Sequence, residues 1–122
     1  MLSDSPLIAV VDDDDAIRKA LSRLLRACGF GVECFASGQA FLAALPSAQL
    51  DCVLLDLQMP EMDGLEVLVW VRDRAPDLPV IIITAHDEPG TRANCLAGGA
   101  SAYLPKPIDE AVLQQAIADA VR

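Results

Sequence analysis

Residues 10–18 read VVDDDDAIR, and residues 53–64 read VLLDLQMPEMDG. In both segments a short aliphatic run stops at aspartate, since Leu7–Val11 is followed by Asp12 and Cys52–Leu55 by Asp56. Such runs are typical of buried parallel strands. Ligands of open α/β sheets bind where the strands end, so the two segments predict one acidic site at the carboxyl edge of a sheet.

The aspartates of this edge predict a cation site. Carboxylates that lie a few ångströms apart repel one another, so they hold a proton or share a divalent ion. No histidine or cysteine accompanies them, and an all-oxygen set favours Mg²⁺ over zinc. Asp12 and Asp13 are the candidates for metal binding, whereas Asp14 or Asp15 is expected to cap the following helix.

Strand-like and helical patterns alternate five times along the chain, which predicts one α/β domain over residues 1–122 with a parallel sheet covered on both faces. The expected strands are 7–11, 31–35, 52–55, 80–83 and 101–104. The expected helices run from about 17 to 28, from the Ser37 cap to about 45, over 65–75, over 91–97, and from the Asp109 cap to about 121.

Composition excludes several function classes. A hydrophobic fraction of 53% and a mean hydropathy of +0.38 suit one buried core. The net charge of −9 argues against direct nucleic-acid binding, which depends on basic residues. We expect no export signal, because the amino terminus MLSDSPL has no basic stretch followed by an apolar one. We expect no membrane span, because no apolar run approaches the ~18 residues that a span requires. The cysteines are interpreted as buried, reduced thiols of a cytoplasmic protein: Cys28, Cys34, Cys52 and Cys95.

Two more polar side chains end strands. Thr84 follows the fourth expected strand and Lys106 the fifth. Each has a simpler interpretation, Thr84 as a hydroxyl bonded to the backbone and Lys106 as a solvated loop charge. Together with the acidic segments they favour phosphoryl chemistry, in which Asp56 attacks phosphorus while Thr84 and Lys106 hold its oxygens.

Four segments in this order and spacing resemble the receiver domains of two-component response regulators. They are VVDDDDAIR, LLDLQMPEMDG, IIITAH and YLPKP. The resemblance covers essentially all 122 residues and implies a flavodoxin-like, doubly wound (βα)5 fold with strand order 2-1-3-4-5. The phrases ECFASGQAFL and LPVIIITAH are most similar to receivers attached to helix-turn-helix transcription factors.

The resemblance assigns roles to the acidic residues. It implies that Asp56 is the phosphoacceptor. It also implies that Asp12, Asp13, Asp56 and the main-chain carbonyl of Gln58 surround Mg²⁺.

The same resemblance assigns the switch residues. Thr84 would turn its hydroxyl toward the phosphoryl group, and Tyr103 would swing inward to fill the space that Thr84 leaves. Lys106 would form an ion pair with the phosphate, and the Lys106-Pro107 bond would be cis. Gln58 and His86 would tune the lifetime of the phosphorylated state.

The implied function is a signalling switch that catalyses only its own phosphorylation and dephosphorylation. A sensor histidine kinase or phosphotransfer protein would supply the phosphoryl group with Mg²⁺ present. The fourth helix, fifth strand and fifth helix would then change and signal to a downstream effector domain or protein, or form a phosphorylation-dependent homodimer. No direct nucleic-acid or membrane partner is expected.

Several alternatives stay open at this point. Tyr103 has a second interpretation as an edge-strand aromatic with its hydroxyl in water, and His86 as an exposed loop residue. Asp63-Gly64 is interpreted as a turn, and Trp70 as a packing residue. The rival function is a phosphorylation-independent scaffold. A haloacid dehalogenase-type phosphatase would need an acid where Gln58 stands, and a dinucleotide binder would need a glycine-rich first turn.

Overall fold

The computed structural model describes residues 5–47 and 49–121. Within these residues, five strands alternate with five helices, as the sequence predicts. The strands are β1 (Leu7–Val11), β2 (Gly31–Phe35), β3 (Cys52–Asp56), β4 (Val80–Thr84) and β5 (Ala102–Pro105). The helices are α1 (Asp15–Ala27), α2 (Gly38–Ala44), α3 (Gly64–Arg74), α4 (Thr91–Ala97) and α5 (Glu110–Ala120).

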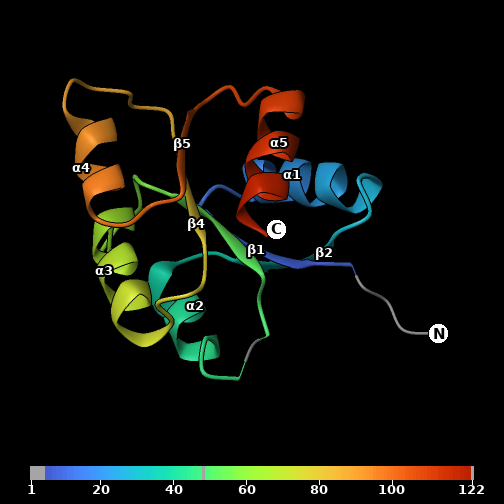
Figure 1. The fold of residues 1–122 in the computed structure, drawn as a ribbon, viewed down its shortest axis with the longest axis horizontal. Helices are drawn as coiled ribbons and strands as arrows, with labels where there is room; N and C mark the ends of the chain where they lie inside the picture. The colour runs from blue at the N-terminus through green and yellow to red at the C-terminus, as the bar shows by residue number, and fades with distance from the viewer. Residues whose placement is uncertain (1–4, 48, 122) are drawn as a thin grey trace.

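The strands form one parallel sheet of order β2-β1-β3-β4-β5, which confirms the expected topology (Figure 1). Its register brings the functional strand ends together. Val11 is paired with Leu55, and Asp56 with Ile83. Thr84 is paired with Pro105, directly before Lys106. The segments that carry the candidate site residues therefore meet at one edge of the sheet.

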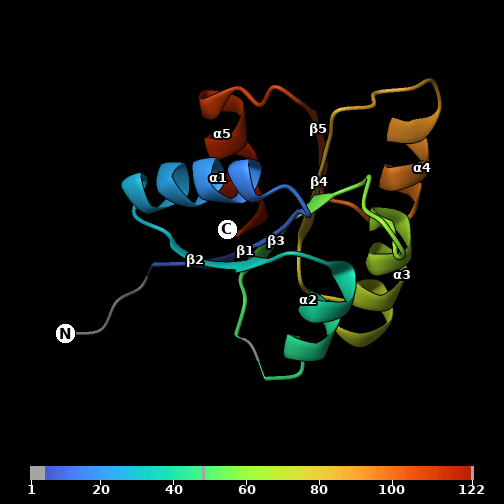
Figure 2. The ribbon, with the colours of Figure 1, turned by 180° about the vertical axis from the view of Figure 1, so that it is seen from behind.

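Helices cover both faces of the sheet. Figures 1 and 2 show α1 and α5 on one face and α2, α3 and α4 on the other. Alternate strand residues enter two hydrophobic clusters, so that Leu54 packs with the α1 and α5 side and Leu55 with the α2, α3 and α4 side. Every residue of β3 and β4 is buried, which explains why both strands are apolar up to their last residue. No helix in the described part of the chain is long and apolar enough to cross a membrane.

Polar side chains cap the starts of four helices. Asp14 is the cap of α1, as one of the two expected candidates, and its carboxylate accepts hydrogen bonds from the N–H groups of Ala16 and Ile17. Ser37 and Asp109 cap α2 and α5, as predicted.

The interpretation of Asp63-Gly64 as a turn is wrong. Asp63 is the cap of α3 and forms a capping box with Glu66, in which each side chain accepts the other residue's main-chain N–H. An aspartate followed three residues later by glutamate is the signature of such a box, and the adjacent glycine obscured it.

Two side-chain predictions fail because the sequence does not reveal which surfaces face solvent. Cys34 is exposed on the edge strand β2 and Cys28 is half-buried, so only Cys52 and Cys95 are the buried thiols expected. Trp70 is 40% exposed rather than packed, because α3 buries the helical stripe that contains Val67, Leu68 and Val71. The Arg74 guanidinium lies 4.2 Å from the centre of the Trp70 ring.

Gly64 allows α3 to begin directly against the segment that follows β3. A Cβ atom at Gly64 would lie 2.6 Å from the main-chain oxygen of Asp56 and 2.8 Å from the Cα of Leu57. The Gly64 N–H donates to the Leu57 carbonyl at 2.9 Å. The start of α3 therefore fixes the backbone next to Asp56, and only glycine permits this approach.

We expect Gly64→Ala to lower the free energy of unfolding by about 1–3 kcal/mol, because the new methyl group meets backbone that has to move. Gly98→Ala is the matched control. Its Cβ would first meet the tip of the Leu68 side chain, at 3.2 Å, and its φ of −77° suits any residue. Urea unfolding of both variants checks the prediction, and equal losses at the two positions would contradict it.

Candidate functional site

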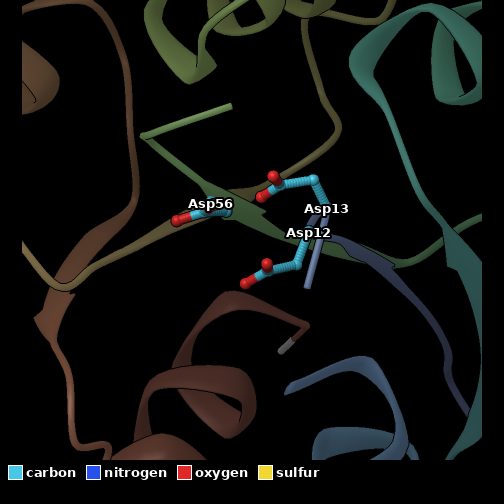
Figure 3. Close-up of side chains that lie close together, drawn as sticks. All are labelled: Asp12, Asp13 and Asp56. Carbon is cyan, nitrogen blue, oxygen red and sulfur yellow. The ribbon is translucent and has the colours of Figure 1, made fainter. Parts of the chain in front are cut away.

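Three carboxylates converge at the carboxyl edge of the sheet (Figure 3). Asp12 and Asp13 follow β1, and Asp56 is the last residue of β3. One oxygen of each lies within 4.8 Å of the others. Asp12 and Asp56 are buried, with exposed fractions of 1% and 3%, whereas Asp13 is exposed. A compact set of carboxylate oxygens that is open on one side suits a hard cation such as Mg²⁺.

The first turn of α1 holds Asp12 in place. The carboxylate of Asp12 accepts the Asp14 N–H at 2.9 Å, and its carbonyl accepts the Arg18 guanidinium at 2.8 Å. Arg18 is held in turn by Asp15, at 3.0 Å. The four-aspartate run therefore divides its roles, because Asp12 and Asp13 face the site while Asp14 and Asp15 organise the helix start.

Lys106 reaches this cluster from the segment after β5. Its Nζ lies 3.0 Å from Asp12 Oδ2 and 3.4 Å from Asp56 Oδ1. Burial lowers the pKa of Lys106, but the carboxylates of Asp12 and Asp56 outweigh burial and raise the pKa overall. The Lys106-Pro107 bond is cis, as expected. Lys106 is therefore not the solvated loop charge of the simpler interpretation.

Asp56 is an uncommonly basic carboxylate. Burial and the neighbouring Asp12 carboxylate raise the pKa of Asp56 from 3.8 to about 6, although Lys106 and the Gln58 main-chain N–H oppose the shift. Ionising Asp56 therefore costs more free energy in this pocket than it does in water. Perturbed groups of this kind are common at functional sites.

Thr84 lies at the end of β4 and is completely buried. Its Oγ1 accepts the His86 N–H at 3.0 Å, and its hydroxyl is 3.4 Å from the His86 carbonyl. The hydroxyl is thus bonded to the backbone, as the simpler interpretation expects. His86 and Gln58 are both exposed, on the segments after β4 and β3.

Tyr103 is buried on β5, with 3% of its surface exposed. Its hydroxyl donates to Asp87 Oδ1 at 2.9 Å, so the interpretation of a water-bonded hydroxyl is wrong. Sequence reasoning did not single out Asp87. The available signal was an acid three residues after Thr84, in a loop that leaves the strand paired with β5.

Comparison with known proteins identifies the family. Residues 8–118 match the model of the response regulator receiver domain. This chain is a member of that family. It is 46% identical over 108 residues to the DNA-binding transcriptional regulator NtrC of Salmonella typhimurium, covering 87% of this chain and 23% of NtrC. It is 38% identical over 115 residues to the transcriptional regulatory protein FixJ of Bradyrhizobium diazoefficiens, covering 94% of this chain and 56% of FixJ.

Solved structures agree with the fold of this receiver domain. A CheY-like receiver domain protein from Methanospirillum hungatei superposes with a TM-score of 0.91 at 28% identity, over 97% of this chain and 94% of that one. The receiver spans 23% of the length of NtrC and 56% of the length of FixJ. Its acidic pocket and Lys106 are consistent with a phosphoacceptor switch, and as a receiver domain it is not a conventional enzyme.

We expect Asp56→Asn to stabilise the metal-free receiver above pH 6. The raised pKa means that the folded state binds this proton more tightly than the unfolded chain does. Ionised Asp56 therefore costs stability above its folded pKa of about 6, and the cost disappears below about pH 4, where both states are protonated.

The gain from Asp56→Asn should approach about 3 kcal/mol at pH 8 and fall to nothing near pH 4. Urea unfolding in chelator across this pH range measures it. Asp73→Asn, an exposed acid of α3, serves as the control and should give no such pH dependence. A gain that stays constant with pH, or a loss at pH 8, would show that Asp56 is not destabilised by its surroundings.

Proposed function

We propose that this receiver accepts a phosphoryl group on Asp56 from a partner histidine kinase or phosphotransfer protein, with Mg²⁺ present. The single observation that carries the proposal is the buried Asp56 carboxylate at the end of β3. It lies within 4.8 Å of the Asp12 and Asp13 oxygens and 3.4 Å from Lys106 Nζ. A nucleophile and a hard-cation site suit phosphoryl transfer, and a fixed ammonium suits binding of the transferred group.

The reaction is a direct displacement at phosphorus. An Asp56 oxygen forms a bond to phosphorus while the bond from phosphorus to the donor's nitrogen or oxygen breaks, and that bond's electron pair leaves with the donor. The donor is a phosphohistidine or a small acyl phosphate. Lys106 is placed to contact the oxygens of the transferred group, because its Nζ already lies beside Asp56.

Asp12, Asp13 and Asp56 would hold the Mg²⁺ ion, joined by the main-chain carbonyl of Gln58. Their oxygens fit such an ion by type and by spacing. When bound, the ion supplies positive charge that offsets the repulsion between a phosphate and these carboxylates. Asp13 is exposed, so the site would be reachable from solvent on the side of this residue.

The new dianion would change the α4-β5-α5 surface. Thr84 would exchange its contacts with His86 for the phosphoryl oxygens, and Lys106 would follow them. A shift from a rare to a dominant active arrangement requires about 5 kcal/mol of differential binding. A few charge-assisted hydrogen bonds from Thr84 and Lys106 can supply this amount.

The names of the relatives and the net charge of the chain support a proposal for how the receiver would signal onward. The printed names of NtrC and FixJ describe transcriptional regulators, and this chain spans only part of each. Residues 1–122 would act as one receiver domain in the cytoplasm, coupled to an effector or paired in a phosphorylation-dependent homodimer. With a net charge of −9, any contact with DNA would belong to the effector. Gln58 and His86 would set the phosphoryl lifetime from the rim of the pocket.

Incubation with acetyl phosphate and Mg²⁺ should add one phosphoryl group to the wild type and none to Asp56→Asn, because only Asp56 combines the nucleophile with the cation site. Intact mass measures the adduct, and Asp73→Asn is the control for the loss of one acid. Labelling of Asp56→Asn, or labelling of the wild type that persists after a chelator removes Mg²⁺, would contradict the assignment of Asp56 as the phosphoacceptor. If the wild type shows no adduct and binds no Mg²⁺, the phosphorylation-independent scaffold is favoured instead.

Lys106→Ala should still be labelled at saturating Mg²⁺, but its response should be weaker. Loss of one charge-assisted contact reduces the ratio of active to inactive receiver by about tenfold or more. Amide chemical shifts of α4 and β5, recorded with and without acetyl phosphate, measure this ratio. Lys19→Ala removes the exposed lysine of α1 and is the matched control. A full response in Lys106→Ala would exclude the proposed role of Lys106.

A further inference from the structure

Asp87 links two side chains that belong to different strands. It lies in the exposed loop between β4 and α4, three residues after Thr84. Its Oδ1 accepts the hydroxyl of Tyr103 at 2.9 Å, from the neighbouring strand β5. Asp87 is thus an exposed acid that is bonded to a buried phenol, and the functional site described above does not use it.

The same loop also binds Thr84. The N–H and the carbonyl of His86, the residue before Asp87, contact Thr84 Oγ1 at 3.0 and 3.4 Å. Two consecutive loop residues therefore connect the hydroxyl of Thr84 with the hydroxyl of Tyr103. A movement of Thr84 away from His86 would break contacts to the segment that carries Asp87.

The orientation of Tyr103 is fixed from more than one side. Besides its bond to Asp87, the ring has the Arg92 guanidinium of α4 at 6.0 Å from its centre. Burial, together with the Asp87 carboxylate, raises the pKa of the Tyr103 phenol to about 12. The neutral phenol is therefore kept as the hydrogen-bond donor, and the ring joins the loop to α4.

Tyr103 is buried although Thr84 has not turned toward a phosphoryl group. The resemblance to receivers implies that Tyr103 fills the volume that Thr84 leaves when it turns to the phosphoryl group. In this structure Tyr103 is buried while the Thr84 hydroxyl is bonded to His86. Tyr103 is therefore buried without a movement of Thr84, and its hydroxyl donates a hydrogen bond to Asp87.

We propose that Asp87 is a positioning residue that holds Tyr103 in its buried orientation and so connects the β4–α4 loop to β5. The orientation of Tyr103 is then set by the loop as well as by Thr84. The consequence for signalling rests on the proposed function. Part of the active arrangement would exist before phosphorylation, so the phosphoryl group would have to supply less of the free-energy difference between the inactive and active arrangements.

The chain has one tyrosine, so Tyr103 can be observed without background. Ring carbons of ¹³C-labelled tyrosine, measured with a soluble paramagnetic relaxation agent, report the exposure of Tyr103 in the unphosphorylated protein. Asp87→Ala should lower the ratio of buried to exposed ring by about tenfold, because a hydrogen bond to a charged acceptor is lost. Glu88→Ala removes the next acid of the same loop and should leave the ring buried.

A double-mutant cycle separates the specific bond from a general effect on the loop. If Asp87 acts through the Tyr103 hydroxyl, Asp87→Ala should cost no further stability once Tyr103→Phe is present. An unchanged ring in Asp87→Ala, equal release in Glu88→Ala, or additive stability losses would each overturn the proposal.

Labelling with acetyl phosphate tests the proposed function separately. Asp87→Ala should accept the phosphoryl group as the wild type does, since Asp87 does not contact Asp56. Failure of the wild type to label would remove the phosphoacceptor function. The measured position of Tyr103 would still decide whether Asp87 holds it.

Discussion

The Lys106 ammonium lies between two buried carboxylates, 3.0 Å from Asp12 and 3.4 Å from Asp56. In the sheet order β2-β1-β3-β4-β5, Lys106 follows the outer strand β5, and it reaches past the end of β4 to the acids of β1 and β3. Lys106 can contact both acids only because the ends of β1, β3, β4 and β5 lie at the same edge of the sheet. The parallel sheet, with helices on both faces, is therefore the condition for the site.

The site works against the stability of the fold that carries it. Burial and Asp12 raise the pKa of Asp56 to about 6, so ionising Asp56 in the folded, metal-free pocket costs more free energy than in water. Hydrophobic packing offsets this loss of stability, because every residue of β3 and β4 is buried. The close approach of Gly64 and the capping box of Asp63 hold the backbone next to Asp56. The rest of the fold thus holds Asp56 in a pocket where its ionisation lowers the stability of the folded state.

Sequence reasoning predicted the fold well because its signals are local. Aliphatic runs locate β1 to β5 within two residues, and the family resemblance implied the strand order. It failed where the outcome depends on tertiary surroundings. The exposure of Cys34 and Trp70 depends on which strand lies at the edge and which helix face is covered. The bond between Asp87 and Tyr103 joins residues 16 positions apart through a loop whose path no local pattern specifies.

The most direct test of the shared site is a crystal structure of the receiver with Mg²⁺ and beryllofluoride, a mimic of the phosphoryl group. We predict an ion among the oxygens of Asp12, Asp13 and Asp56, with beryllofluoride on Asp56. We also expect Lys106 Nζ to contact a fluoride and the Thr84 hydroxyl to have left His86. An ion or beryllofluoride bound elsewhere, or Lys106 and Thr84 unchanged beside an occupied Asp56, would show that these four strand ends do not form one phosphoryl-binding unit.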